Sequence, residues 1–196
     1  MAITTVLMMK RVFGLSLRAL QGFVDAIFKL MVLPLRCPDY SLISKRAKTV
    51  KISIKTPTRG EISPLVIDGT GLKVFGEGEW KVRQHGADRR RVWRELHMAA
   101  DSVKHEIICA DLSLSGTTDA QALPAQRLSG NNDVWKKQVG YHRRSVAETA
   151  IFRFKTLMGD HLSLRDYDAQ VGEAMAMVKA LNKMTLLGMP NSIRIA

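Results

Sequence analysis

The stretch VIDGTGLKVF, residues Val66–Phe75, decides the fold of this chain. Apolar residues surround one carboxylate, Asp68, and the pattern predicts a buried strand with an acid near its middle. An acid inside an apolar strand is costly unless it is paired or binds a metal. Metal-dependent nucleases need such an acid on a rigid strand, close to a second acid. The alternative is that Asp68 begins a turn before Gly69.

Further strands are expected on both sides of this stretch. Val50–Lys55 alternates apolar and polar residues, as a half-buried strand does. Val92–Ala100 and Glu106–Leu114 predict a hairpin. Two helices are predicted to follow the strands: Tyr141 or Ser145 to Met158, and Leu164 to Leu187. The fold class is therefore α/β (α+β), a mixed sheet flanked by helices over residues 50–196.

Residues 1–49 predict a separate helical region ahead of the sheet. A first helix covers residues 3–13, Ser16 is a candidate N-cap for a second, and Asp39 or Ser41 for a short third. Three short helices with a basic last one resemble a helix-turn-helix in outline. A simple helical packing subdomain explains the same pattern.

The predicted helix that ends near Met158 has a polar stripe. At 100° per residue, Tyr141, Arg144, Glu148 and Lys155 fall on one narrow face. The opposite face is apolar: Val146, Ala150, Phe154 and Leu157. An acid flanked by cations suits a metal ion beside phosphates. A solvated surface with an Arg144–Glu148 ion pair is the simpler explanation of the geometry alone.

The chain is strongly basic. It has 30 Lys and Arg residues against 18 Asp and Glu, a net charge of +12 and a pI of about 10.0. Nucleic acid is the commonest partner of such a chain. A loop bordered by Trp80 and Trp93 concentrates this charge: Arg83, Arg89, Arg90 and Arg91. Clustered arginines beside aromatic rings suit a nucleic-acid backbone, and a solvated basic loop is the alternative.

Several other classes of protein are not indicated. The two cysteines, Cys37 and Cys109, lie far apart, and neither they nor the five histidines have zinc-site spacing. Residues 1–35 are apolar, but charged residues interrupt them before the roughly 20 residues that a membrane span needs. We therefore expect a protein of the reducing cytoplasm, without a membrane partner.

The polar stripe also matches a family signature. Tyr141, Arg144, Glu148 and Lys155 fit every spacing of the pattern Y-(2)-R-(3)-E-(6)-K. With it the chain resembles the DDE transposases of bacterial insertion elements, whose catalytic domain has a ribonuclease H-like fold. The run from Val66 to Gly86 is similar to the group's first catalytic strand, and RRVWRELHMAAD is similar to the next strand.

The resemblance implies roles for these residues. Asp68 would be the first and Glu148 the last of the acids that bind Mg²⁺ (or Mn²⁺) in catalysis. Arg144 and Lys155 would contact DNA phosphates near the cut, and Tyr141 would support the bound transposon end. The implied reaction is metal-dependent strand hydrolysis, followed by attack of the freed 3′-hydroxyl on target DNA. The implied partners are terminal inverted repeats and target DNA, with a second copy or an intact transposase as a further candidate.

One departure from the family limits this expectation. The family places a second catalytic Asp on a strand between the other two acids, usually in a D-G-x-Y-D-like run, yet Asp68-Gly69 is the only Asp-Gly pair here. The passage from TTDAQALPAQ to RLSGNNDVW predicts an internal deletion near residues 125–127, and the start of the chain predicts N-terminal shortening. The acids left between are poor substitutes: Asp101, Asp119 and Asp111, the last of which is expected to end a strand.

A chain with two acids should bind metal weakly, if at all, and its sheet should keep a hole or an open edge. We therefore expect little or no strand transfer. Two alternatives remain open at this point. One is a non-catalytic basic DNA-binding protein derived from a transposase, and the other is a basic RNA-binding protein, which rests on charge alone.

Overall fold

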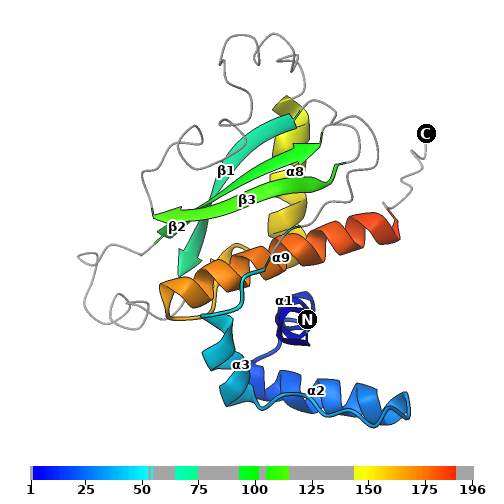
Figure 1. Ribbon diagram of the computed structural model, residues 1–196. Coiled ribbons are helices and arrows are strands. Elements are labelled where there is room, and N and C mark those ends of the chain that lie inside the picture. Colours follow the sequence, from blue (N-terminus) through cyan, green and yellow to red (C-terminus); the bar gives the residue numbers. More distant parts are fainter. Residues whose placement is uncertain are drawn as a thin grey trace, which may run out of the picture.

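The computed structural model describes residues 2–52, 54, 65–74, 93–101, 105–114 and 144–188. The elements within these residues follow in the order α1 (Ala2–Val12), α2 (Leu17–Leu30), α3 (Tyr40–Ala47), β1 (Leu65–Val74), β2 (Trp93–Asp101), β3 (Ile107–Leu114), α8 (Arg144–Met158), β4 (His161–Leu162) and α9 (Tyr167–Leu187). Figure 1 shows α9 lying between the sheet and helices α1–α3.

The strands form one mixed sheet in the order β3-β2-β1-β4. β1 pairs antiparallel with β2, and β2 pairs antiparallel with β3, so the predicted hairpin is confirmed. β4 is parallel to β1 and pairs only with Lys73 and Val74. β1 continues through Gly69 and Gly71, so Asp68 lies inside a strand and not at a turn. A mixed sheet flanked by helices confirms the α/β expectation and is consistent with a ribonuclease H-like fold.

The strand predicted over Val50–Lys55 is wrong for the described residues of that stretch. Residues 50–52 and 54 pair with no described strand; Ser53 and Lys55 lie outside the described residues. Ile52 and Ile54 are half-buried and pack against the core. The alternation of apolar and polar residues therefore reflects which side chains face the core. A segment can show this alternation without forming backbone hydrogen bonds to a neighbouring strand.

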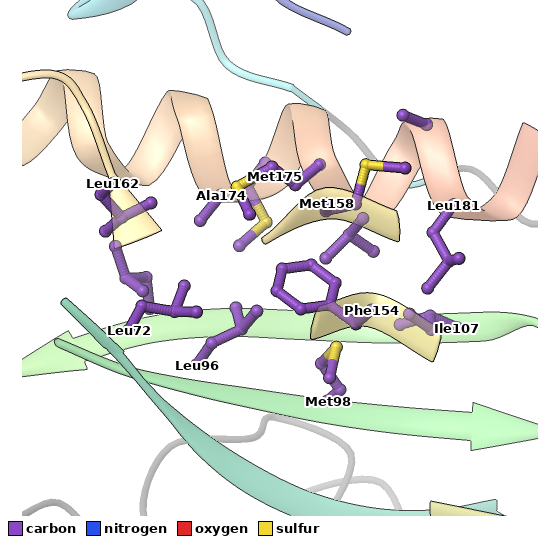
Figure 2. Packing of buried hydrophobic residues seen from close by; sticks show 14 residues of the cluster. Leu72, Leu96, Met98, Ile107, Phe154, Met158, Leu162, Ala174, Met175 and Leu181 are labelled. Atoms are coloured by element: carbon purple, nitrogen blue, oxygen red, sulfur yellow. The ribbon is translucent and has the colours of Figure 1, made fainter. Parts of the chain in front are cut away.

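The main core lies between one face of the sheet and helices α8 and α9. Leu72, Leu96 and Met98 project from β1 and β2 on this face, because side chains alternate along each strand. Figure 2 shows Phe154 of α8 between α9 and the strands, above Leu96 and Met98. Phe154 is fully buried, and a ring buried in this way stabilises a fold by about 2–3 kcal/mol.

Local signals in the sequence determine helices α1–α3. Gly14 adopts a φ of +62° after α1, the Ser16 hydroxyl caps α2, and the Asp39 carboxylate caps α3. The three predicted helices are confirmed. Their apolar faces form a second core with residues of α9, and the division into domains at 49/50 stays a prediction. No helix among the described residues is long and apolar enough to cross a membrane.

A buried ion network joins α1 to α9. The Glu173 side chain is 1% exposed and lies 3.0 Å from the Lys10 ammonium through its Oε1 atom. Its Oε2 atom accepts hydrogen bonds from the backbone N–H groups of Ser163 at 2.8 Å and Leu164 at 2.9 Å. The Arg11 guanidinium adds a second cation, with Nη1 3.4 Å from Oε1.

The cations decide the charge state of Glu173. Burial alone would raise the pKa of this carboxyl. The charges of Lys10 and Arg11, together with hydrogen bonds from Ser163 and Leu164, outweigh burial and hold its pKa below the ordinary value. The network is therefore an ionised carboxylate between two cations, at the contact of the first and last helices.

Helices α3 and α9 approach each other closely at Gly172. A Cβ atom added there would lie 2.6 Å from the backbone oxygen of Ala47, which cannot move aside without moving α3. The substitution Gly172→Ala is expected to lower the free energy of unfolding by about 1–3 kcal/mol, because the helices must separate. Urea denaturation followed by circular dichroism measures this change.

Gly22 in α2 provides the matched control. An added Cβ there meets nothing within 4 Å. Gly22→Ala is expected to raise the free energy of unfolding by up to about 1 kcal/mol, since alanine favours a helix interior over glycine. Equal effects of the two substitutions would contradict the close α3–α9 contact.

Candidate active site

Strand β1 positions Asp68 on the sheet face that carries helices α8 and α9. Asp68 lies opposite Met98 of β2, which is buried in the main core. Alternation along β1 places Asp68 on the same face as Thr70 and Leu72. The side chain is half-buried, and its Oδ1 atom accepts a hydrogen bond of 2.9 Å from the Gly69 N–H. The carboxylate thus lies at the border between core and solvent.

Helix α8 presents Glu148 on the side away from the core. Its buried side chains recur at helical spacing: Ala147, Ala150, Phe154 and Met158. Glu148 and Lys155 are exposed. The predicted polar stripe opposite an apolar face is therefore confirmed for these two residues.

The apolar face itself is rotated from the prediction. Leu157, expected to face the core, is 45% exposed. The core direction of α8 is set by Ala147, Phe154 and Met158, so Leu157 lies at the border of the buried face. Periodicity gave the width of this face, and packing against the sheet determined its direction.

The end of α8 is fixed to the end of β1. Gly159 ends the helix with a φ of +85°. The backbone N–H of Lys73 donates to the Asp160 carbonyl at 2.9 Å, and the Lys73 ammonium donates to Asp160 Oδ2 at 3.0 Å. The hydrogen bond from Lys73 lowers the pKa of Asp160, although slight burial opposes it.

The Lys73–Asp160 hydrogen bonds, called the Lys73–Asp160 clamp below, join the ends of the two elements that carry Asp68 and Glu148. Asp68 is five residues before Lys73 on the strand, which corresponds to about 17 Å. Glu148 is twelve residues before Asp160 in the helical part of the chain, which corresponds to about 18 Å. In Figure 1, β1 and α8 begin at the same end of the sheet, and the two elements are in contact. Asp68 and Glu148 therefore both lie in the first half of two elements that are in contact.

Both acids lie toward the outer edge of β1. On this edge β4 pairs with Lys73 and Val74, and from Leu65 to Leu72 no described strand pairs with it. The opposite flank of α8 faces α9, because Arg153 donates to the Thr185 hydroxyl at 2.8 Å. Glu148 lies about 140° around the helix from Arg153, on the side of that edge.

The sequence of the chain matches known families in the region of β1. Two family models, both described as the transposase DDE domain, match residues 1–77 and residues 59–139. Together the two matches span residues 1–139 of the 196-residue chain.

The chain belongs to the DDE transposases.

No solved structure was found to match this transposase. Asp68 lies within both matched ranges, whereas Glu148 lies beyond them. The assignment of Glu148 therefore depends on its spacing from Tyr141, Arg144 and Lys155 and on its position beside β1.

Among the acids between Asp68 and Glu148 in the sequence, Asp111 was expected to be the least poor substitute for the missing Asp. Asp111 lies inside β3 and not at its end, because pairing with β2 continues to Leu114, so the expectation that it ends a strand is wrong. Asp111 is opposite His97, which is in turn opposite Gly69, so it projects from the sheet face away from Asp68.

Of the other two candidate acids, only Asp101 lies among the described residues, and it adds no ligand on the helix face. Asp101 is buried at the end of β2, opposite Leu65, also on the face away from Asp68, and Asp119 lies outside the described residues. No group of three His, Cys, Asp or Glu side chains that could hold a metal ion is found in the part of the transposase that the structure describes. Asp68 and Glu148 do not by themselves fit a two-metal centre, whose ions lie about 4 Å apart and share carboxylate ligands.

Most of the predicted DNA contacts fall outside the part of the chain that the structure describes. Tyr141 and the basic loop residues lie outside the described residues: Arg83, Arg89, Arg90 and Arg91. Arg144 is the first residue of α8, and Lys155 is exposed two turns after Glu148 on the same flank. The DNA-binding roles of all these residues stay predictions.

The Lys73–Asp160 clamp and β4 were not predicted. Asp160 directly follows the helix-ending Gly159, which was a usable signal for a tight connection. A two-residue strand such as β4 is too short to show an alternating pattern. These residues matter because they set the position of α8, and so of Glu148, relative to β1.

Proposed function

We propose that this transposase chain binds duplex DNA and retains two of the family's three catalytic acids, Asp68 and Glu148, but performs little or no strand cleavage or transfer. One observation carries the proposal. Asp68 lies on β1 and Glu148 on the contacting helix α8, and the described residues contain no group of three His, Cys, Asp or Glu side chains that could hold a metal ion. The DNA partners would be the terminal repeats of the element and the target DNA.

The proposed inactivity follows from the ligand set. Mg²⁺ or Mn²⁺, when bound, would stabilise the charge that develops during phosphoryl transfer and activate the attacking oxygen. Asp68 and Glu148 would hold such an ion, with Lys155 as a cation for a nearby phosphate. Two carboxylates from two elements give weak binding, because hard cations require several oxygen ligands.

The proposed internal deletion accounts for the missing acid. In the family the second Asp lies on a strand between the other two acids. The outer edge of β1 is adjacent to both Asp68 and Glu148, and from Leu65 to Leu72 it has no partner among the described strands. A strand lost near residues 125–127 would have paired there and supplied the acid.

Purified chain is expected to show no Mg²⁺- or Mn²⁺-dependent cleavage or joining of DNA that carries the sequences flanking its reading frame. The reason is the incomplete set of acids. Gel analysis of labelled DNA ends measures cleavage and joining together. Metal-dependent products that disappear in Asp68→Ala would overturn the proposed inactivity.

DNA binding by the same samples tests the other half of the proposal. Asp68→Ala and Glu148→Ala are expected to bind duplex DNA as the unchanged chain does, which also fits the non-catalytic DNA-binding alternative. Competition between duplex DNA and structured RNA tests the remaining alternative, a basic RNA-binding protein. A strong preference for RNA would overturn the proposal.

A further inference from the structure

A cleft of about 750 Å³ lies where the N-terminal helices meet the sheet domain. It is formed by the end of α1, the start of α2, the end of α8 and the segment around β4. Its polar and charged lining includes Lys10, Arg11, Arg18 and His161, and its apolar lining includes Leu15 and Leu17. Its volume is within the range of sites for small ligands. Met158, which lines the cleft, is ten residues after Glu148, or about 15 Å along α8, so the cleft is separate from the acids.

The wall of the cleft has an excess of positive charge. Lys10 and Arg11 share a single carboxylate, Glu173. The nearby Asp160 carboxylate is bound by Lys73. Arg18 adds a further cation on the exposed surface of α2, where its guanidinium stacks 4.8 Å from the centre of the Tyr40 ring and donates to the Tyr40 hydroxyl at 3.2 Å.

Arg11 has an unused donor in this wall. Its side chain is 6% exposed, and its Nη2 atom donates to the carbonyls of Met158 and His161. Its buried Nε atom has no hydrogen-bond partner among the described residues. Buried donors are normally paired, and an unpaired one is commonly explained by a bound ion or water.

The start of α2 adds backbone donors to the cleft. The Ser16 hydroxyl accepts a hydrogen bond from the Ala19 N–H at 3.4 Å. The N–H groups of Leu17 and Arg18 have no acceptor among the described residues. The first turn of a 14-residue helix carries a partial positive charge and favours anions.

We propose that this cleft binds a phosphate of the DNA backbone. The Leu17 and Arg18 amides and the Arg18 guanidinium contact the phosphate oxygens, and the charges of Lys10 and Arg11 attract them. Leu15 and Leu17 provide apolar surface for the adjoining sugars. DNA as the source of the phosphate rests on the proposed function, whereas phosphate binding itself rests on the cleft. Through this cleft the N-terminal helices would contact the DNA backbone near the C-terminal end of α8. Glu148 lies near the N-terminal end of the same helix.

Arg18→Glu tests the cleft, with Lys29→Glu as the matched control. Both residues are exposed on α2, and Lys29 is in its last turn, away from the cleft. Arg18→Glu is expected to weaken binding of a fluorescent DNA duplex by roughly tenfold at low salt, and to reduce the slope of log affinity against log salt by about 1. Lys29→Glu is expected to change both quantities much less.

Backbone NMR of the unchanged chain gives a readout that does not depend on DNA. Inorganic phosphate is expected to shift the Leu17 and Arg18 amide resonances, and sodium chloride at equal ionic strength is not. If phosphate shifts neither amide resonance, and Arg18→Glu and Lys29→Glu weaken DNA binding equally, the proposed phosphate site in the cleft is overturned. The proposal that the chain binds DNA would still stand. Amide shifts without any DNA binding would support the phosphate site and reject DNA as its source.

Discussion

Glu173→Gln is expected to lower the free energy of unfolding by about 3–5 kcal/mol, because it leaves the Lys10 and Arg11 cations buried without a counter-charge. The amide keeps the size of the side chain, so the loss reports charge and not a cavity. Urea denaturation at neutral pH, followed by circular dichroism, measures it.

The exposed Lys48–Asp166 pair is the control for this result. Its N···O distance is 2.9 Å, similar to that of Lys10–Glu173, but both side chains are about half exposed. Lys48→Gln is expected to change stability much less, since water solvates both charges when the pair is broken. Equal losses would show that Glu173 is also solvated.

The pH dependence of the Glu173→Gln effect has a defined sign. The folded pKa of Glu173 is lowered from the ordinary value of 4.5, so its ionised form stabilises the fold above that value. The stability difference between the unchanged chain and the variant is expected to be constant well above pH 4.5 and to shrink as the pH falls through the folded pKa. A difference that grows in acid would contradict an ionised carboxylate.

Phe154→Ala is expected to lower the free energy of unfolding by about 3–5 kcal/mol, because it removes a fully buried ring from the main core. Phe154 lies between α8, α9 and the strands (Figure 2), so the cavity would loosen the attachment of α8 to the sheet. Chemical denaturation measures the loss.

Phe152 in the same helix is the matched control. Its side chain is 69% exposed, so Phe152→Ala is expected to change stability by less than about 0.5 kcal/mol. Equal effects of the two phenylalanine substitutions would contradict the orientation of α8, and with it the exposure of Glu148.

The helices were predictable because their signals are local. Ser16 and Asp39 supply capping oxygens, and Gly159 supplies the left-handed conformation that ends α8. β1 was predictable from its apolar run, and the hairpin from two alternating stretches. Each of these features depends on residues within a few positions of one another.

The features that were not predictable depend on distant partners. Residues 50–52 and 54 alternate like a strand, but no described strand pairs with them. The face on which Asp111 projects depends on the register between β2 and β3. Glu173 could be an exposed helix acid by sequence alone, and only the docking of α1 shows that it is buried.

The candidate site likewise combines features that local sequence predicts with features that depend on distant residues. Spacing along α8 placed Glu148 on a polar stripe, the apolar run placed Asp68 in a strand, and the resemblance to the family made both of them candidate catalytic acids, a role that stays a prediction. The attachment of α8 to β1 depends in part on the Lys73–Asp160 clamp, which joins residues 87 positions apart. The outer edge of β1 depends on which strands pair there, and that pairing is a property of the whole sheet.

The ion network at Glu173 also limits when, during synthesis of the chain, helix α1 can dock on helix α9. Lys10 and Glu173 are separated by 163 residues, so α1 leaves the ribosome long before its partner helix exists. At usual rates of synthesis the interval is roughly 10–30 s. During that time α1 is a basic, apolar helix without its counter-ion. Helices α1 and α9 can therefore join only after translation is nearly finished, and a chain that stops short of Glu173 leaves Lys10 and Arg11 without this buried counter-charge.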